Sequence, residues 1–151
     1  MKLDNSFMQE AVKEAKKAFD LDEVPVGAVI VDVTTGKIIA KTHNRNILNK
    51  DSTAHAEILA LKEACRVKNS HRLDDCDLYI TLEPCAMCAG AISLSRIRRI
   101  YYGASDKKSG AVEHGARVFE SPACHHKPEV YGNINSQECE NLLKDFFAKK
   151  R

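Results

Sequence analysis

Residues 78–88 read Leu78-Tyr79-Ile80-Thr81-Leu82-Glu83-Pro84-Cys85-Ala86-Met87-Cys88. The first five residues are apolar or β-branched, and they predict a short buried strand that stops at Pro84. Proline suits the first position of a helix, so we expect a helix from Pro84 to about Leu94. Cys85 and Cys88 then lie in its first turn. This stretch indicates an α/β protein with two thiols at a strand-to-helix junction.

The rest of the chain alternates helices and strands in the same way. Apolar residues at helical spacing from Met8 to Phe19 predict an amphipathic first helix. We expect, in chain order, a strand hairpin over 26–33 and 37–42, a helix from 55 to about 67, a strand over 99–102, a long glycine-bearing region over 104–128 with a short helix near Ala116, and a closing helix that includes 142–147. Together they predict a single domain over residues 1–151, an α/β protein in a three-layer α/β/α arrangement.

Composition narrows the class of protein. The chain has 151 residues, of which 23 are basic and 21 acidic, so its net charge of +2 neither requires nor excludes a nucleic-acid partner. Residues 1–6 lack the apolar stretch of a signal peptide, which favours six reduced cysteines in the cytoplasm over a disulfide framework. No uncharged apolar run approaches the roughly 18 residues of a membrane span, so we expect no membrane association.

A second motif, His55-Ala56-Glu57, precedes the two cysteines by about 30 residues. Two thiolates and an imidazole are ligands that suit Zn²⁺. Three protein ligands, His55, Cys85 and Cys88, leave the fourth tetrahedral position for water, which is typical of a catalytic zinc site rather than a structural one. Glu57 would then carry the proton.

The spacing of the second motif requires an irregular helix start. Residues two apart point roughly 200° away from each other in a regular helix, so His55 and Glu57 can share a site only from its first turn. We expect Ser52 or Thr53 to cap that helix. Two helix N-termini would face the metal and favour the thiolates.

The other cysteines have simpler interpretations. A lone C-x2-C pair is as typical of a structural zinc or core role as of catalysis, and only its combination with His-x-Glu and Pro84 favours catalysis. Cys65 and Cys139 fall on apolar helix faces and are predicted to be buried thiols. Residues 124–126, Cys-His-His, could hold a second metal, but they lack a spaced partner pair and are more typical of a surface loop. Cys76 receives no role.

With these residues in view, the chain resembles the bacterial tRNA-specific adenosine deaminases (TadA-type) of the cytidine deaminase-like superfamily. The resemblance covers nearly the whole length, whereas the zinc motif alone also admits cytidine, deoxycytidylate, guanine and riboflavin-precursor deaminases. The segments that carry it are Val24-Pro25-Val26-Gly27-Ala28, His43-Asn44-Arg45, Thr53-Ala54-His55-Ala56-Glu57-Ile58, Thr81-Leu82-Glu83-Pro84-Cys85, Cys88-Ala89-Gly90-Ala91-Ile92, Ser95-Arg96-Ile97, Gly103-Ala104, Lys108-Ser109-Gly110-Ala111 and Leu142-Leu143-Lys144-Asp145-Phe146-Phe147.

The resemblance implies a fold and an activity. It implies one CMP/dCMP-type deaminase domain around a mixed five-stranded sheet, one Zn²⁺ per subunit, and a homodimer whose interface helps shape an RNA-binding surface. The implied reaction is hydrolytic conversion of adenosine to inosine at the wobble position of a tRNA anticodon stem-loop. A base is flipped out of an open loop more easily than out of a duplex, so an anticodon loop is a reasonable substrate.

By matching position, the resemblance also implies roles for individual residues. Asn44 would hydrogen-bond the flipped base, Asp106 would lie at the nucleotide backbone, and three apolar residues would line the base pocket: Val24, Leu82 and Phe147. Basic residues that could contact phosphates are Arg45, Arg96, Arg98, Lys107, Lys108, Lys149, Lys150 and Arg151, although each alone is more typical of a solvated surface charge.

Three departures from the family pattern bear on the RNA contacts. Ser52 stands where proline is common, His125 replaces a frequent asparagine, and Glu113-His114 replace smaller residues in a loop near the RNA. Two other functions stay open at this stage. One is a guanine or nucleotide (cytidine or deoxycytidylate) deaminase of the same fold, and the other is a non-catalytic RNA-binding module with structural zinc.

Overall fold

The structure is a computed structural model, and it describes residues 6–150. One sheet holds five strands in the order β2-β1-β3-β4-β5. Their bounds are Gly27–Asp32 (β1), Lys37–His43 (β2), Cys76–Leu82 (β3), Arg99–Ala104 (β4) and Glu129–Tyr131 (β5). Strand β1 pairs antiparallel with β2 and β3, whereas β3, β4 and β5 run parallel to one another. The sheet is therefore mixed, and the expected five-stranded α/β fold is confirmed.

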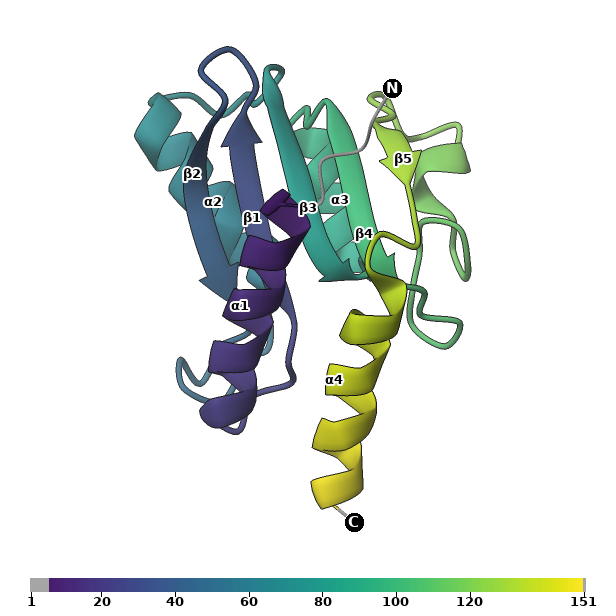
Figure 1. Cartoon of the computed structure of the whole chain (residues 1–151). Coiled ribbons are helices and arrows are strands. Elements are labelled where there is room, and N and C mark those ends of the chain that lie inside the picture. Colours follow the sequence, from purple (N-terminus) through teal and green to yellow (C-terminus); the bar gives the residue numbers. More distant parts are fainter. Residues whose placement is uncertain (1–5, 151) are drawn as a thin grey trace.

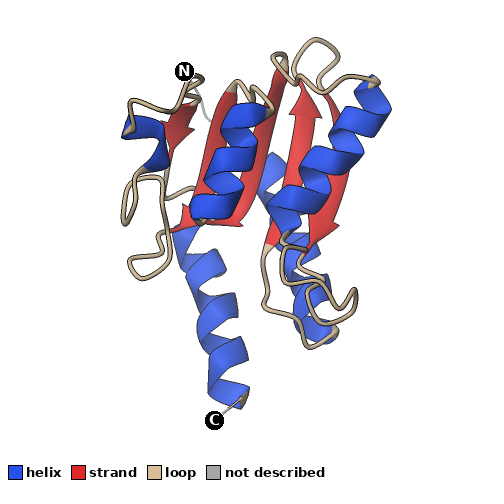
Figure 2. Ribbon diagram, turned by 180° about the vertical axis from the view of Figure 1, so that it is seen from behind, coloured by secondary structure: helices blue, strands red, loops and turns tan. Residues whose placement is uncertain are grey.

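Helices cover both faces of the sheet. Helices α1 (Ser6–Asp20) and α4 (Ser136–Lys149) lie on the face turned toward the viewer in Figure 1. Helices α2 (Ala56–Lys68) and α3 (Ala86–Leu94) cover the opposite face, which Figure 2 shows. A 3-10 turn, η1 (Val118–Glu120), lies close to the short helix expected near Ala116. The three-layer α/β/α arrangement is thus present.

The two central strands explain why the layers hold together. Every residue of β1 is buried, and β3 is buried up to Leu82, so both strands need apolar cover on each face. Helix α1 supplies it on one side with an apolar stripe that includes Met8, Ala11 and Val12. A Cβ atom at Gly27 would lie 2.0 Å from the carbonyl oxygen of Ala11, so only glycine permits this close approach of α1 to β1.

The strand boundaries differ from the sequence prediction by one or two residues, and one strand is additional. Strand β3 begins at Cys76, two residues before the apolar run, because the pairing with β1 extends to the Asp32–Cys76 register. Strand β5 was not predicted, since its three partly exposed residues carry no periodic signal and depend on pairing with β4. Within residues 6–150, no helix is long and apolar enough to cross a lipid bilayer.

The topology brings the two motifs to one end of the sheet. Helix α2 follows β2, and α3 follows β3, so both helices begin at the end of the sheet where β3 stops (Figure 1). Ligands in α/β sheets commonly bind beyond the carboxyl ends of strands, next to helix N-termini.

Candidate active site

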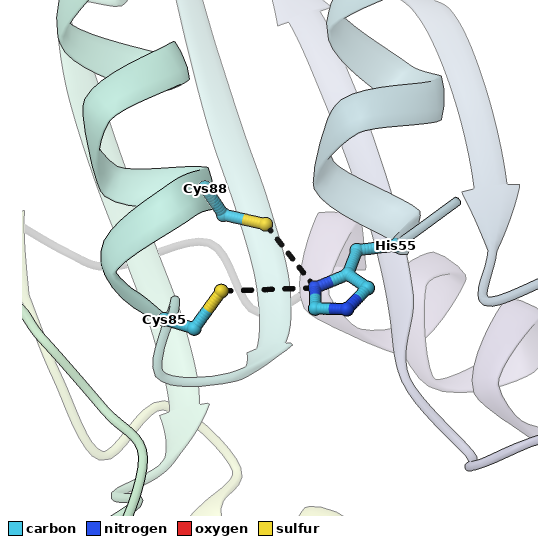
Figure 3. Close-up of side chains that lie close together, drawn as sticks. All are labelled: His55, Cys85 and Cys88. Carbon is cyan, nitrogen blue, oxygen red and sulfur yellow. Dashed lines mark hydrogen bonds between the residues drawn. The ribbon is translucent and has the colours of Figure 1, made fainter. Parts of the chain in front are cut away.

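Three possible metal ligands meet where α2 and α3 begin. His55 is the N-cap residue of α2, Cys85 is the N-cap residue of α3, and Cys88 lies in the first turn of α3. Their ligand atoms lie within 4.8 Å of one another, and no other such group of three exists in the described part of the chain. Figure 3 shows both sulfurs pointing toward the imidazole.

The distances between these atoms fit a zinc ion. The Nδ1 atom of His55 lies 3.7 Å from Sγ of Cys85 and 3.4 Å from Sγ of Cys88. One ring nitrogen carries at most one proton, so it cannot donate to both sulfurs at once. A tetrahedral zinc ion, with bonds of about 2.3 Å to sulfur and about 2.0 Å to nitrogen, requires a separation of about 3.5 Å. The three side chains are therefore arranged to share one ion.

The two thiols differ in their protonation. Hydrogen bonds with Cys88 and His55 lower the pKa of Cys85 to about 4, so this sulfur is a thiolate at neutral pH. The hydrogen bond with Cys85, together with burial, raises the pKa of Cys88. The hydrogen bond with Cys85 also raises the pKa of His55. Because metal ligands bind deprotonated, Cys88 would have to lose its proton when a metal binds.

Glu57 lies beside this group and is not part of it. Only 4% of Glu57 is exposed, although it lines the same cavity. Burial raises the pKa of Glu57 to about 7, against smaller opposing effects of its own backbone hydrogen bond and of His55. A carboxyl group with such a pKa can both accept and release a proton near neutral pH.

The cavity next to these side chains has a volume of about 280 Å³, close to that of a small-ligand site. The cavity brings together most of the catalytic, metal-binding and base-binding residues that the sequence predicts. Its lining is Val24, Val26, Asn44, Asn46, His55, Glu57, Leu82, Glu83, Cys85, Asp106 and Ser109. Phe147 is not among them: it is 48% exposed and borders an adjoining hollow with Asp106, Lys108 and Ser109.

The helix starts differ from the prediction. Neither Ser52 nor Thr53 caps α2; instead, the Oδ1 atom of Asn44 accepts a hydrogen bond of 2.8 Å from the backbone N–H of Ala56. With Oδ1 engaged in this way, Nδ2 is the remaining donor group of the Asn44 side chain, and Asn44 lines the cavity. Pro84 likewise precedes the N-cap residue of α3 rather than occupying the first helical position.

Two buried carboxylates that sequence reasoning missed hold the loops around the cavity. Glu23 accepts hydrogen bonds from the backbone N–H groups of Ile47 and Leu48, in the loop that follows Asn44. Glu83 accepts hydrogen bonds from the loop over 105–115. Burial alone would raise the pKa of Glu83, but hydrogen bonds from the backbone of Asp106 and from other groups in that loop lower it below its usual value. No local sequence pattern reveals either role, because the partners are backbone groups of distant segments.

The basic residues suggested for RNA contact are scattered. Lys149 and Lys150 lie 3.8 and 2.5 Å from the carboxylate of Asp22, and the Nζ atom of Lys149 lies 4.2 Å from the centre of the Phe19 ring. Arg45 donates to Asn49, whereas Lys108 is exposed beside Asp106. Arg151 lies outside the described residues.

The remaining cysteines have structural surroundings. None of the six cysteines forms a disulfide bond. Cys139 is buried as predicted, whereas Cys65 is only partly buried, since it packs at the edge of the core. Cys124 lies in a loop beside Ser93 and joins no group of three metal ligands among residues 6–150.

The fold and the site define a zinc-binding deaminase of the cytidine deaminase-like class. A family model described as the cytidine and deoxycytidylate deaminase zinc-binding region matches residues 1–104. A tRNA-specific adenosine deaminase from Rickettsia bellii is 53% identical over 144 residues, which are 95% of this chain and 99% of that protein. The corresponding protein of Bacillus subtilis is 42% identical over 151 residues, which are 100% of this chain and 92% of that protein. The chain belongs to the family of these deaminases.

Solved structures agree with this assignment. One, from a study of A-to-I editing by tRNA:A34 deaminases at the wobble position of transfer RNA, has a TM-score of 0.90 and 50% identity, and the match covers 93% of this chain and 100% of that one. A guanine deaminase from Bacillus subtilis has a TM-score of 0.66 and 34% identity, with 86% of this chain and 85% of that one covered.

Proposed function

We propose that this chain hydrolyses adenosine to inosine at the wobble position of a tRNA anticodon. The observation that carries the proposal is the group of His55, Cys85 and Cys88 with the buried Glu57 in the same cavity. The full-length similarity to tRNA-specific adenosine deaminases supports the choice of substrate. In the reaction, water adds its oxygen to the base and the amino group leaves as ammonia.

His55, Cys85 and Cys88 would hold one Zn²⁺ per subunit, since their separations fit that ion. When bound, the ion supplies a Lewis acid that makes water a stronger nucleophile near neutral pH. Glu57 takes a proton from the water and gives it to a ring nitrogen. The same carboxyl group then moves a proton to the departing amino group.

Other cavity residues would hold the base and its backbone. Val24 and Leu82 supply apolar walls, and Asp106 would contact the nucleotide backbone near the target. Phe147 would extend the apolar surface from the adjoining hollow. Arg45, Lys108, Lys149, Lys150 and Arg151 remain proposed phosphate contacts, of which Lys149 and Lys150 would first have to leave Asp22.

Asn44 would donate a hydrogen bond from Nδ2 to an acceptor on the flipped base. The variant Asn44→Asp keeps an oxygen for the Ala56 N–H and loses the donor. We expect kcat/KM for tRNA to fall by about 10- to 100-fold, as one hydrogen bond is lost and an acceptor is left facing another acceptor. Steady-state kinetics and thermal unfolding measure this together. Equal kcat/KM values for Asn44→Asp and the wild type would remove Asn44 from base recognition.

We also propose a homodimer that uses α3. Met87 and Leu94, seven residues apart on that helix, are 38% and 81% exposed, although both are apolar. Leu94 borders a groove of about 320 Å³ that is also lined by Gly90, Val118 and Ala123. A second copy packed here would lie along the helix that carries Cys85 and Cys88.

The variant Leu94→Lys should weaken this dimer. A buried unpaired charge costs several kcal/mol, so we expect dissociation to become at least about 10²-fold easier. Light scattering over a concentration series measures the effect, with Val67→Lys on the outer side of α2 as the control. A monomeric wild type, or a dimer unaffected by Leu94→Lys, would contradict the proposed interface.

Two further expectations, on domain organisation and cellular location, complete the proposal. Residues 1–151 would form one deaminase domain, since a single sheet joins the described elements. The cytoplasm would be its location, because six free thiols suit a reducing compartment and tRNA is found there.

A panel of substrates tests the proposed function. Purified protein is incubated with unmodified tRNA that carries adenosine at the wobble position, and separately with guanine, cytidine and deoxycytidylate. We expect inosine in the tRNA and no ammonia from the small substrates. The similarity to a guanine deaminase makes that activity the second candidate, and ammonia from guanine without inosine in tRNA would establish it instead.

A further inference from the structure

The loop over 105–115 contributes Asp106 and Ser109 to the cavity wall and packs against one buried carboxylate, that of Glu83. The Glu83 side chain is fully buried, and it belongs to the turn between β3 and Cys85. It accepts five hydrogen bonds, all from this loop. A Cβ atom at Gly110 would lie 2.6 Å from Cδ of Glu83, so the loop backbone rests directly on the carboxylate.

We propose that Glu83 and His114 form a positioning pair that fixes this loop and thereby sets where Asp106 and Ser109 stand for the substrate. The part that concerns substrate rests on the proposed function. Neither residue is assigned contact with the reacting atoms.

The hydrogen bonds connect the pair to the cavity wall. Oε1 of Glu83 accepts from the backbone N–H of Asp106 at 3.1 Å and from Nδ1 of His114 at 2.7 Å. Oε2 accepts from three successive backbone N–H groups, those of residues 112–114, at 3.0 to 3.1 Å. The Oδ1 atom of Asp106 in turn accepts from the backbone N–H groups of Lys108 and Ser109. The position of Ser109 thus depends on Glu83 through Asp106.

Two residues of this loop that depart from the family pattern, Glu113 and His114, each form a hydrogen bond with a buried side chain. His114 supplies the only side-chain donor to Glu83 among the five hydrogen bonds. Glu113 accepts a hydrogen bond of 2.5 Å from the hydroxyl of the buried Tyr102 on β4. Glu113 therefore joins the loop to strand β4, and His114 joins it to the turn after β3. The family resemblance had suggested instead that these two residues change the contacts with RNA.

Loss of the imidazole should loosen the loop without touching the metal site. A hydrogen bond to a charged group is among the stronger ones in a protein, so the ordered arrangement becomes less populated when the donor is removed. The apparent affinity for the substrate falls in proportion to the fraction of molecules whose loop is ordered. This effect acts equally on the ground state and the transition state, so KM should rise while kcat stays nearly constant.

Amide hydrogen exchange and kinetics on zinc-loaded full-length protein test the pair. In His114→Ala, we expect the backbone amides of Asp106 and residues 112–113 to exchange at least about 10-fold faster, with the amides of β3 unchanged. We expect KM for an anticodon stem-loop to rise about 10-fold with kcat within about 2-fold of the wild type. His114→Asn should restore both values, since its Nδ2 can donate from a position close to that of Nδ1. His71→Ala, an exposed histidine at the opposite end of the sheet, is the control.

Three results would overturn the proposal: unchanged exchange in His114→Ala, a fall in kcat at constant KM, or an asparagine variant that behaves like the alanine variant. The exchange measurement needs no substrate. A wild-type protein inactive on tRNA would contradict the proposed function, yet faster exchange in His114→Ala would still support the positioning pair.

Discussion

Glu57→Ala is expected to lower the turnover of wobble adenosine by at least about 10²-fold, the lower end of what a positioned acid or base contributes. Zinc should stay bound, because His55, Cys85 and Cys88 are untouched. The fold should also persist, since the replaced carboxyl group is buried and its removal leaves no unpaired charge. Single-turnover rates, zinc content and thermal unfolding measure the three quantities on one sample.

Two companion variants sharpen the result. Glu57→Gln keeps the size of the side chain but cannot carry the proton, so it should be as slow as Glu57→Ala. Glu63→Ala removes an exposed carboxylate from the same helix, paired with Arg66, and should react at the wild-type rate. A non-catalytic RNA-binding module with structural zinc predicts instead that Glu57→Ala changes nothing. Unaltered turnover in Glu57→Ala would therefore reject the proposed chemistry.

Cys88→Ala is expected to lose metal and stability together. Cys88 is fully buried in the first turn of α3, with its sulfur next to Nδ1 of His55. Its loss removes one ligand and leaves the ion with two protein side chains. We expect zinc affinity to fall by more than about 100-fold, beyond the loss typical of a residue that only supports a ligand. If zinc stabilises the wild type by mass action, this change removes about 2.7 kcal/mol or more of stability.

Competition with a chelator and thermal unfolding with and without added zinc measure this effect. Cys65→Ala is the matched control, because that thiol lies at the edge of the core on α2 and does not belong to the group of metal ligands. The wild type and Cys65→Ala should both be stabilised by zinc, whereas Cys88→Ala should not. A Cys88→Ala protein that retains one zinc per chain would mean that the ion is held elsewhere.

The sequence predicts the elements well where a pattern repeats within one element. The apolar spacing of α1 and the β-branched run of β1 each give a local signal, and both elements form there. Strand β5 has three residues and exists through its pairing with β4, which no local pattern records. Short edge strands are therefore the part of this fold that periodicity misses.

The same distinction separates the predicted from the missed parts of the site. The residue types and spacing of the two zinc-ligand motifs can be recognised in the sequence, and the structure brings His55, Cys85 and Cys88 together as expected. The cap of α2 comes from Asn44 on the preceding segment, so Ser52 and Thr53 were wrong choices.

Glu23 and Glu83 were missed for a related physical reason. Glutamate is a charged residue that usually lies at the surface. Nothing in the sequence indicates that backbone N–H groups of distant segments will surround a particular glutamate side chain. Here, both acids hold loops that border the cavity. Such residues become visible only when the loops are placed in space.

Isotope labelling in water enriched in ¹⁸O tests the central claim most directly. Zinc-loaded protein is mixed with tRNA that carries adenosine at the wobble position, and that nucleotide is analysed by mass spectrometry. Hydrolysis by a water molecule activated beside Glu57 predicts inosine at that position with one ¹⁸O on its base. Adenosine left intact by the zinc-loaded protein, or inosine without the label, would contradict it.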